Sequence, residues 1–353
     1  VNPSNKMGTM PVRRLVLHMS WPMMLSMLIQ ALYNMVDSMF VSRLNREAFE
    51  ALSLSYPVQM FMVAVCVGTG VGVNALLARS MGQGDREKAG QVAGNGLFLG
   101  VCIYVLFLLF GLFGVRPYLL TQTSDPLVLE LAGSYLTICC VYSFGQVLFT
   151  IYEKLLQATG HAVLSTIAQV SGAVTNIILD PILIFGYFGA PELGVAGAAY
   201  ATVLGQMVSF VLFMVFQYTC NREVPAGVRY LIPEGKVMKE ILSVGFPAII
   251  MQAVGSFLTY GVNVIFGTLS ASAVTAYGVY YKIQQFAFFA AFGMNNAMIP
   301  VIAFLAVTAA ELVAGSIVVE QVFAVPGIGR LLLASIGSRD FPVAQAVVVL
   351  LAV

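Results

Sequence analysis

Residues 174–185 have the sequence VTNIILDPILIF, in which one carboxylate, Asp180, stands beside a proline among apolar side chains. The whole chain shares this character, because hydrophobic residues make up 59% of it, charged residues make up 9%, and mean hydropathy is +0.90. A water-soluble protein of 353 residues needs a more polar surface, so this composition predicts an integral membrane protein. The net charge of +1 argues against a polyanionic partner, and we expect no nucleic acid.

Eight stretches are long and apolar enough to cross a bilayer as helices, which takes about 20 residues each. They are 15–42, 52–78, 92–115, 133–152, 162–188, 194–217, 241–268 and 273–304. The connecting segments are short and contain turn-forming residues, as at 83–85 and 123–126. The chain is therefore predicted to be an all-α protein that crosses the membrane many times.

Lysine and arginine are distributed unevenly between the two sides of these predicted helices. With a cytoplasmic N-terminus, three basic residues face outward, namely Arg43, Arg46 and Arg116. Eleven then face the cytoplasm: Lys6, Arg13, Arg14, Arg79, Arg86, Lys88, Lys154, Arg222, Arg229, Lys236 and Lys239. Because basic loops tend to stay inside the cell, we expect a multi-pass protein of the cytoplasmic membrane whose N-terminus is cytoplasmic.

A shift of 225 residues aligns the beginning of the chain with a later part. It pairs Trp21–Pro22 with Phe246–Pro247, Tyr56 with Tyr281, Phe61 with Phe286 and Gly68 with Gly293. Parallel repeats of this kind occur in several transporter folds. The pattern predicts a six-helix lobe at 1–218, a cytoplasmic linker at 219–240 and two helices of a second lobe at 241–304. Residues 305–353 do not continue the repeat.

Two acids lie inside the predicted spans and away from their ends, Asp37 and Asp180. A charge at the centre of a membrane helix costs about 3 kcal/mol on insertion scales, so it is a functional hypothesis by default. Asn176 precedes Asp180 by four residues and shares its helix face. Asp180 lies eight residues before 188, Thr202 lies eight after 194, and Asp37 lies five before 42. These groups are therefore expected at a similar depth in the outer half of the bilayer.

Asp37, Asn176, Asp180 and Thr202 offer hard oxygen ligands that suit Na⁺ or a proton. Pro181 adds another, because it cannot donate to the Ile177 carbonyl. The alternative is a structural hydrogen-bond cluster that ties three helices together. We also predict a cavity beside this cluster, lined by Tyr33, Asn34 and Gln206.

The remaining motifs indicate no catalysis. Gly68 and Gly72 end an apolar helix instead of following a strand, so we predict close helix packing there and no nucleotide site. No nucleophile–base or metal pair appears, so we expect no enzyme, no catalytic residue and no cofactor beyond a coupling ion.

Several blocks of the chain resemble the multidrug and toxic compound extrusion (MATE) family. They are SWPMMLSMLIQALYNMVDSMFVSRL, MGQGDREKAG and TNIILDPILIFGYFGAPELGVAGAAYATVLGQ, and the resemblance covers about residues 10–304. It implies two six-helix lobes, a central cavity and exchange of organic cations for Na⁺ or H⁺. The family's N-lobe cation site matches Asp37, Asn176, Asp180 and Thr202. The expected partners are small cationic drugs or dyes and the lipid bilayer, and the expected state is a monomer.

The end of the chain resembles a different family. Residues 315–353, GSIVVEQVFAVPGIGRLLLASIGSRDFPVAQAVVVLLAV, are similar to the permease subunit of peptide- or nickel-importing ABC transporters. We therefore predict a fusion in which residues from about 306 to 353 form a foreign helical tail.

Multidrug efflux is the leading functional prediction. One alternative is a subunit of an ABC peptide importer, which the tail alone favours. Another is a lipid or polysaccharide flippase of the same superfamily, which a cavity with several basic residues would favour.

Overall fold

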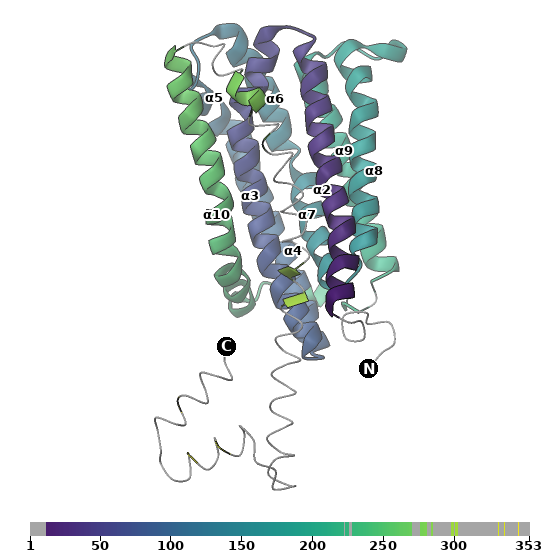
Figure 1. Ribbon diagram of the computed structural model, residues 1–353. Helices are drawn as coiled ribbons and strands as arrows, with labels where there is room; N and C mark the ends of the chain where they lie inside the picture. The colour runs from purple at the N-terminus through teal and green to yellow at the C-terminus, as the bar shows by residue number, and fades with distance from the viewer. Residues whose placement is uncertain are drawn as a thin grey trace.

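The computed structural model describes residues 12–221, 223–225 and 228–269, with isolated positions between 276 and 345. Its α-helices run side by side as a bundle (Figure 1). They are α2 (Val12–Ser42), α3 (Arg46–Gly82), α4 (Arg86–Leu109), α5 (Val115–Leu120), α6 (Pro126–Val141), α7 (Phe144–Ala158), α8 (Ala162–Phe185), α9 (Val195–Thr219) and α10 (Gly235–Leu269). A π-helical turn, Phe110–Gly114, joins α4 to α5, and 3₁₀ turns occupy Tyr187–Gly189 and Val228–Leu231. Within the described ranges there is no strand, which confirms the all-α prediction.

Six of the described helical segments are long and apolar enough to cross a membrane, or seven if one bent pair counts as a span. With the bent pair counted as one span, they correspond to the first seven predicted spans. α10 begins at Gly235, so it takes up part of the predicted linker at 219–240. The predicted span at 273–304 and the predicted tail at 305–353 lie outside the described residues, apart from isolated positions.

The short turns between helices owe their compactness to helix caps. Asn45 accepts a hydrogen bond from the Ala48 N–H at 2.6 Å, and Asp85 accepts one from the Lys88 N–H at 3.0 Å. Each side chain satisfies a backbone donor that the first turn of a helix leaves without a partner. At the other end of a span, Gly186 terminates α8 in the left-handed region with φ of 72°.

The predicted span at 133–152 corresponds to a bent pair of helices. The structure has two helices there, α6 and α7, which are bent by 47° where they meet at Tyr142 and Ser143. Just after the bend, Gly145 lies against α9, and a Cβ at this position would be 2.8 Å from the Met207 sulfur. The bend brings α7 onto α9, and a tertiary contact of this kind leaves no trace in hydropathy.

The three glycines Gly68, Gly70 and Gly72 set the distance between α3 and its neighbours. A Cβ on Gly68 would overlap Ile249 of α10, and a Cβ on Gly72 would overlap the carbonyl of Ile241. Close helix packing at Gly68 and Gly72 is thereby confirmed. Gly70 faces the other way, toward α7.

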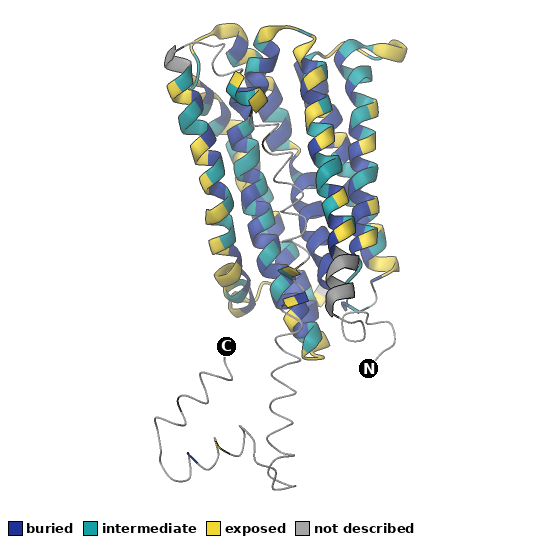
Figure 2. Ribbon diagram, viewed as in Figure 1, coloured by how far each residue is buried: buried dark blue, intermediate teal, exposed yellow. Residues whose placement is uncertain are grey.

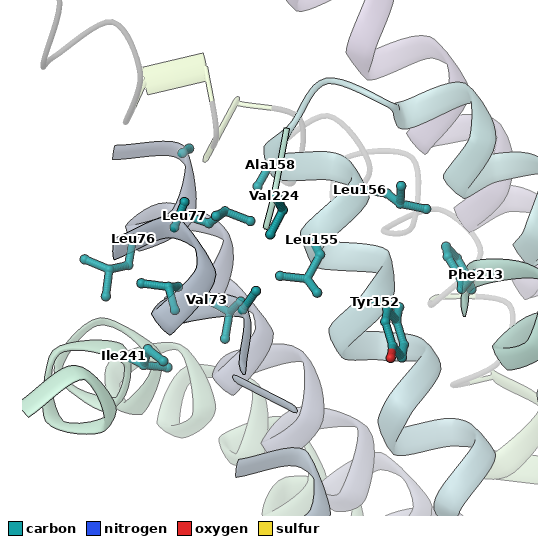
Figure 3. Close-up of a cluster of buried hydrophobic side chains, with 14 of the residues drawn as sticks. Val73, Leu76, Leu77, Tyr152, Leu155, Leu156, Ala158, Phe213, Val224 and Ile241 are labelled. Carbon is teal, nitrogen blue, oxygen red and sulfur yellow. The ribbon is translucent and has the colours of Figure 1, made fainter. Parts of the chain in front are cut away.

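A buried hydrophobic cluster joins α3, α4, α7 and α9 to the start of α10, at the end of the bundle where α7 terminates (Figure 3). Its labelled members are Val73, Leu76, Leu77, Tyr152, Leu155, Leu156, Ala158, Phe213, Val224 and Ile241. Buried residues lie on the inward-facing sides of the helices and exposed residues on the outer sides (Figure 2). Many of the exposed residues are large hydrophobics. Since lipid tails are as apolar as these side chains, close packing holds such a cluster together more than exclusion of water does.

The segment between α9 and α10 is docked on α4. The ring of Tyr230 lies against Gly90, where a Cβ would be 2.9 Å from it, and the Tyr230 backbone lies against Gly94. The Glu234 N–H donates to Asn95 Oδ1 at 2.7 Å. The start of α10 is thus fixed to the same end of the bundle as the hydrophobic cluster.

Candidate functional site

Two glycines bring α8 and α9 into close contact beside the predicted cation site. A Cβ on Gly205 would lie 2.7 Å from the Gly172 carbonyl oxygen and 3.1 Å from the Asn176 Cβ. A Cβ on Gly172 would overlap the Ser209 side chain. Thr202 is one turn before Gly205 on α9, so this contact places it opposite Asn176.

The structure brings Asn176, Asp180 and Thr202 together in the interior. Asn176 Nδ2 lies 3.3 Å from Asp180 Oδ1 and 3.4 Å from Thr202 Oγ1, and it donates to both. Asp180 has 0% of its surface exposed. The sequence predicts Asp180 and Thr202 at the same depth, and in the structure both accept a hydrogen bond from the Asn176 amide.

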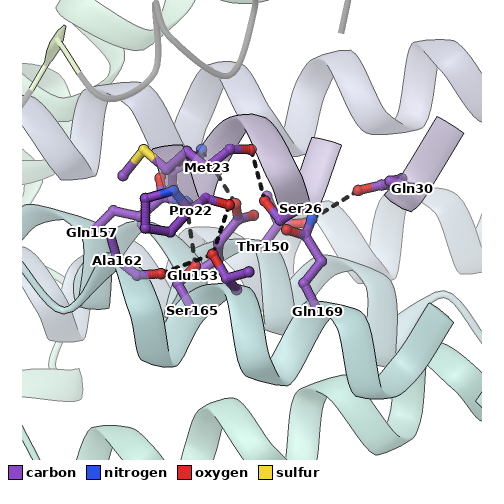
Figure 4. A network of polar contacts seen from close by, with 12 residues as sticks. Pro22, Met23, Ser26, Gln30, Thr150, Glu153, Gln157, Ala162, Ser165 and Gln169 are labelled. Carbon is purple, nitrogen blue, oxygen red and sulfur yellow. Dashed lines mark hydrogen bonds and ion pairs between the residues drawn. The ribbon is translucent and has the colours of Figure 1, made fainter. Parts of the chain in front are cut away.

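Asp37 approaches this group from α2. It is buried, and its carboxyl group interacts electrostatically with that of Asp180. Two hydrogen bonds hold α2 against α8 (Figure 4). Gln169 Nε2 donates to Gln30 Oε1 at 2.7 Å, and Thr166 Oγ1 donates to the Pro22 carbonyl at 2.8 Å.

Two buried acceptor atoms at this site, Asn176 Oδ1 and Asp180 Oδ2, have no hydrogen-bond partner among the described residues. Unsatisfied buried acceptors are costly. Oxygen atoms of carboxylates, amides and hydroxyls are the ligands that hard cations take. These oxygen atoms therefore suit either a small hard cation, which they would coordinate, or a proton bound to the carboxylate.

A small cavity of about 30 Å³ lies directly beside these residues. Its lining consists of Gln30, Tyr33, Gln146, Phe149, Gln169, Gly172, Ala173, Asn176, Thr202, Gly205, Gln206 and Ser209. Tyr33 and Gln206 are among the residues predicted to line a cavity. Asn34 was also predicted to line a cavity but is not part of this lining; its amide donates to the Gln30 carbonyl at 3.0 Å on the same helix. None of the described lining residues carries a charge.

Sequence reasoning missed the three glutamines Gln30, Gln146 and Gln169, which line this cavity. A signal for them was present, since each is a polar side chain within an apolar helical stretch. It also missed a buried charged pair. Lys154 counts as a cytoplasmic loop residue by sequence, whereas the structure leaves only 1% of its surface exposed and places it 3.7 Å from Glu153.

The described helices match a solved transporter structure. An outward-facing conformation of a multidrug resistance MATE family transporter of the MOP superfamily superposes with a TM-score of 0.77 at 26% identity, covering 92% of this chain and 75% of that one. The fold is that of a MATE transporter. In agreement, residues 22–182 match the family model MatE, and these residues contain most of the helices that form the site.

Curated relatives of this MATE-like chain are export proteins by name. The multidrug export protein MepA of Staphylococcus aureus (strain MRSA252) is 26% identical over 295 residues, which cover 83% of this chain. MepA of Staphylococcus haemolyticus (strain JCSC1435) is 28% identical over 299 residues, covering 82% of this chain. The chain spans 64% and 63% of the lengths of these two relatives. Both names agree with the expectation of a membrane transporter and not an enzyme.

Proposed function

We propose that this protein is a multidrug efflux secondary transporter that exchanges organic cations for Na⁺ or H⁺ across the cytoplasmic membrane. The observation that carries the proposal is the fully buried Asp180, with an acceptor oxygen left open beside Asn176 and Thr202. A carboxylate in such a place marks an ion or substrate pathway more often than a structural contact. The small cavity next to it, of about 30 Å³, has room for water, so a drug would enter only in a state in which this polar-lined space is wider.

Coupling requires that ion and drug favour opposite-facing states or compete for one site. Asn176 links the two, because it lines the cavity and also donates to Asp180. A drug that contacts the Asn176 amide perturbs the hydrogen bond to the carboxylate. A cation or proton on Asp180 alters the same amide in turn, so the two ligands are coupled through one side chain.

The names of the relatives support drugs as the substrate class, and we extend this to small cationic drugs and dyes, to a monomer and to a cytoplasmic N-terminus. The flippase alternative is disfavoured because the described cavity lining contains no basic residue for an anionic headgroup. The ABC-permease alternative depends on residues 306–353, and it stays a prediction from the sequence.

Replacing Asp180 with asparagine tests the proposal. Asn is nearly isosteric but cannot take a proton or neutralise a cation, so we expect Asp180→Asn to abolish ethidium export from energised cells while the protein still inserts. Asp125→Asn is the matched control, since Asp125 is an exposed N-cap and Asn caps a helix equally well. Dye export by the Asp180→Asn protein at the rate of the control variant would refute the proposed role.

A further inference from the structure

Four polar side chains of α7 lie on one face of that helix and are all buried. They are Gln146, Thr150, Glu153 and Gln157, at successive intervals of 4, 3 and 4 residues. Such spacing repeats along one side of a helix. The stripe begins at Gln146 in the cavity wall and ends one residue before the last residue of α7.

α8 carries a matching stripe of buried polar side chains: Ser165, Gln169, Asn176 and Asp180. The two stripes meet where Gln157 Nε2 lies 3.4 Å from Ser165 Oγ, and both face the Pro22 end of α2 (Figure 4). From Asp180 to Ser165 the α8 stripe covers 15 residues, or about 22 Å of helix. A polar column therefore runs from the acid pair, past the cavity, to the end of the bundle where α7 meets α8.

A charged pair occupies the far end of this column. Glu153 Oε1 accepts from Gln157 Nε2 at 2.7 Å, and Lys154 Nζ donates to Gln157 Oε1 at 3.0 Å. The Lys154 side chain packs against Gly70 of α3, where an added Cβ would lie 2.7 Å from the Lys154 Cγ. Lys154 is the charged group that the structure records beside Glu153. Burying two charges among apolar side chains is costly, and structural packing alone does not require it.

We propose that Glu153 is the inner station of a proton pathway that connects the Asp37–Asp180 pair with the cytoplasm. This inference rests on the proposed function and specifies its coupling ion. A proton released by the acid pair crosses the cavity and is taken up by the Glu153 carboxylate, which becomes a neutral acid and then returns the proton to cytoplasmic water. Each transfer moves one proton from a donor group to an acceptor group, so charge is conserved.

The Glu153–Lys154 pair favours binding of a proton over binding of Na⁺ for two reasons. A metal ion at Glu153 would lie beside the Lys154 ammonium, 3.7 Å from the same carboxylate oxygen, and would be repelled. A proton, by contrast, binds the carboxylate without needing added volume in a packed interior.

The full chain in proteoliposomes with an internal pH indicator provides the test, with an imposed ethidium gradient driving proton movement in Na⁺-free buffer. The double variant Glu153→Gln/Lys154→Met removes both charges and leaves neither one unpaired. We expect it to lower ethidium-driven proton flux at least tenfold while its melting temperature is unchanged and its ethidium affinity stays within twofold. The matched control is Glu240→Gln/Lys88→Met, which removes a half-exposed ion pair of 3.0 Å and should leave the flux unchanged.

Single substitutions keep the test decisive if the double variant does not fold. Glu153→Asp retains an ionisable group and should keep measurable flux, whereas Glu153→Gln should not; equal flux in the two overturns the pathway. The pathway is also overturned if proton flux persists in the double variant, if it requires Na⁺, or if it is absent from the wild-type chain.

Asp180→Asn separates the two proposals. If that variant loses flux while the double variant keeps it, only the Glu153 station fails; if Asp180→Asn keeps flux, the proposed function fails.

Discussion

Replacing Gly205 with alanine should separate α8 from α9 at the candidate cation site. The added Cβ would lie 2.7 Å from the Gly172 carbonyl oxygen, whereas ordinary contacts begin at 3.4 Å, so the helices must move apart by about 0.7 Å. The hydrogen bond from Asn176 to Thr202 is already 3.4 Å long. Such a displacement takes it beyond hydrogen-bond range.

The expected cost follows from overpacking a close helix contact, which is typically about 1–3 kcal/mol. We expect Gly205→Ala to lower the free energy of unfolding by that amount, measured by titration with a denaturing detergent. Ethidium export should fall about tenfold or more, because the site loses one of its aligned ligands. The loss of export should exceed what the remaining fraction of folded protein explains.

Gly261→Ala is the matched control. Gly261 lies within α10, and a Cβ there meets nothing within 4 Å. Alanine is the better helix former by about 1 kcal/mol, so this variant should be as stable as the wild type or more so, with unchanged export. If Gly205→Ala unfolds at the same detergent fraction as Gly261→Ala, the close contact between α8 and α9 does not exist as described.

Two further substitutions test how α10 is attached to the bundle. Gly72→Ala places a Cβ against the Ile241 carbonyl, and we expect it to lower the free energy of unfolding by about 1–3 kcal/mol; a melting temperature equal to that of Gly261→Ala would contradict this. Asn95→Ala removes the acceptor of the Glu234 N–H, costs about 1 kcal/mol and should speed proteolysis between α9 and α10 roughly fivefold. Glu87→Gln disrupts only an exposed pair with Arg229 and should not change cleavage, so equal rates in the two variants would count against the docked linker.

The helices were accessible from the sequence because a bilayer imposes length and hydropathy on them directly. The contact of Gly68 and Gly72 with another helix was accessible for a related reason, since glycines at this spacing have few other uses in a membrane span. The bend at Tyr142 was not, because no proline marks it and its contact with α9 leaves no local pattern in the sequence. The burial of Lys154 was not accessible either, because a lysine near the end of an apolar run usually extends to the surface. Only the tertiary structure shows it covered by α3.

Some residues of the candidate site could likewise be predicted from the sequence and others could not. Asp180 and Asn176 stand out because they are four residues apart on one helix, a relation that sequence alone reveals. Thr202 follows from comparing depths. The glutamine-rich wall of the cavity comes from three helices at once, and no local pattern shows that Gln30, Gln146 and Gln169 face a common space.

The hydrogen bonds between α2 and α8 have a consequence for biosynthesis. Gln30 and Pro22 of α2 pair with residues that lie 139 and 144 positions later in the chain. At about 5–20 residues per second, the ribosome needs on the order of ten seconds to produce those partners. During this interval α2 must wait at the translocon or in lipid with Asp37 unassembled, at a cost of about 3 kcal/mol if the acid is ionised at the bilayer centre. The nascent helix is then a natural client for membrane chaperones or quality-control proteases, and mutations in α8 should shorten the lifetime of the new chain before they affect transport.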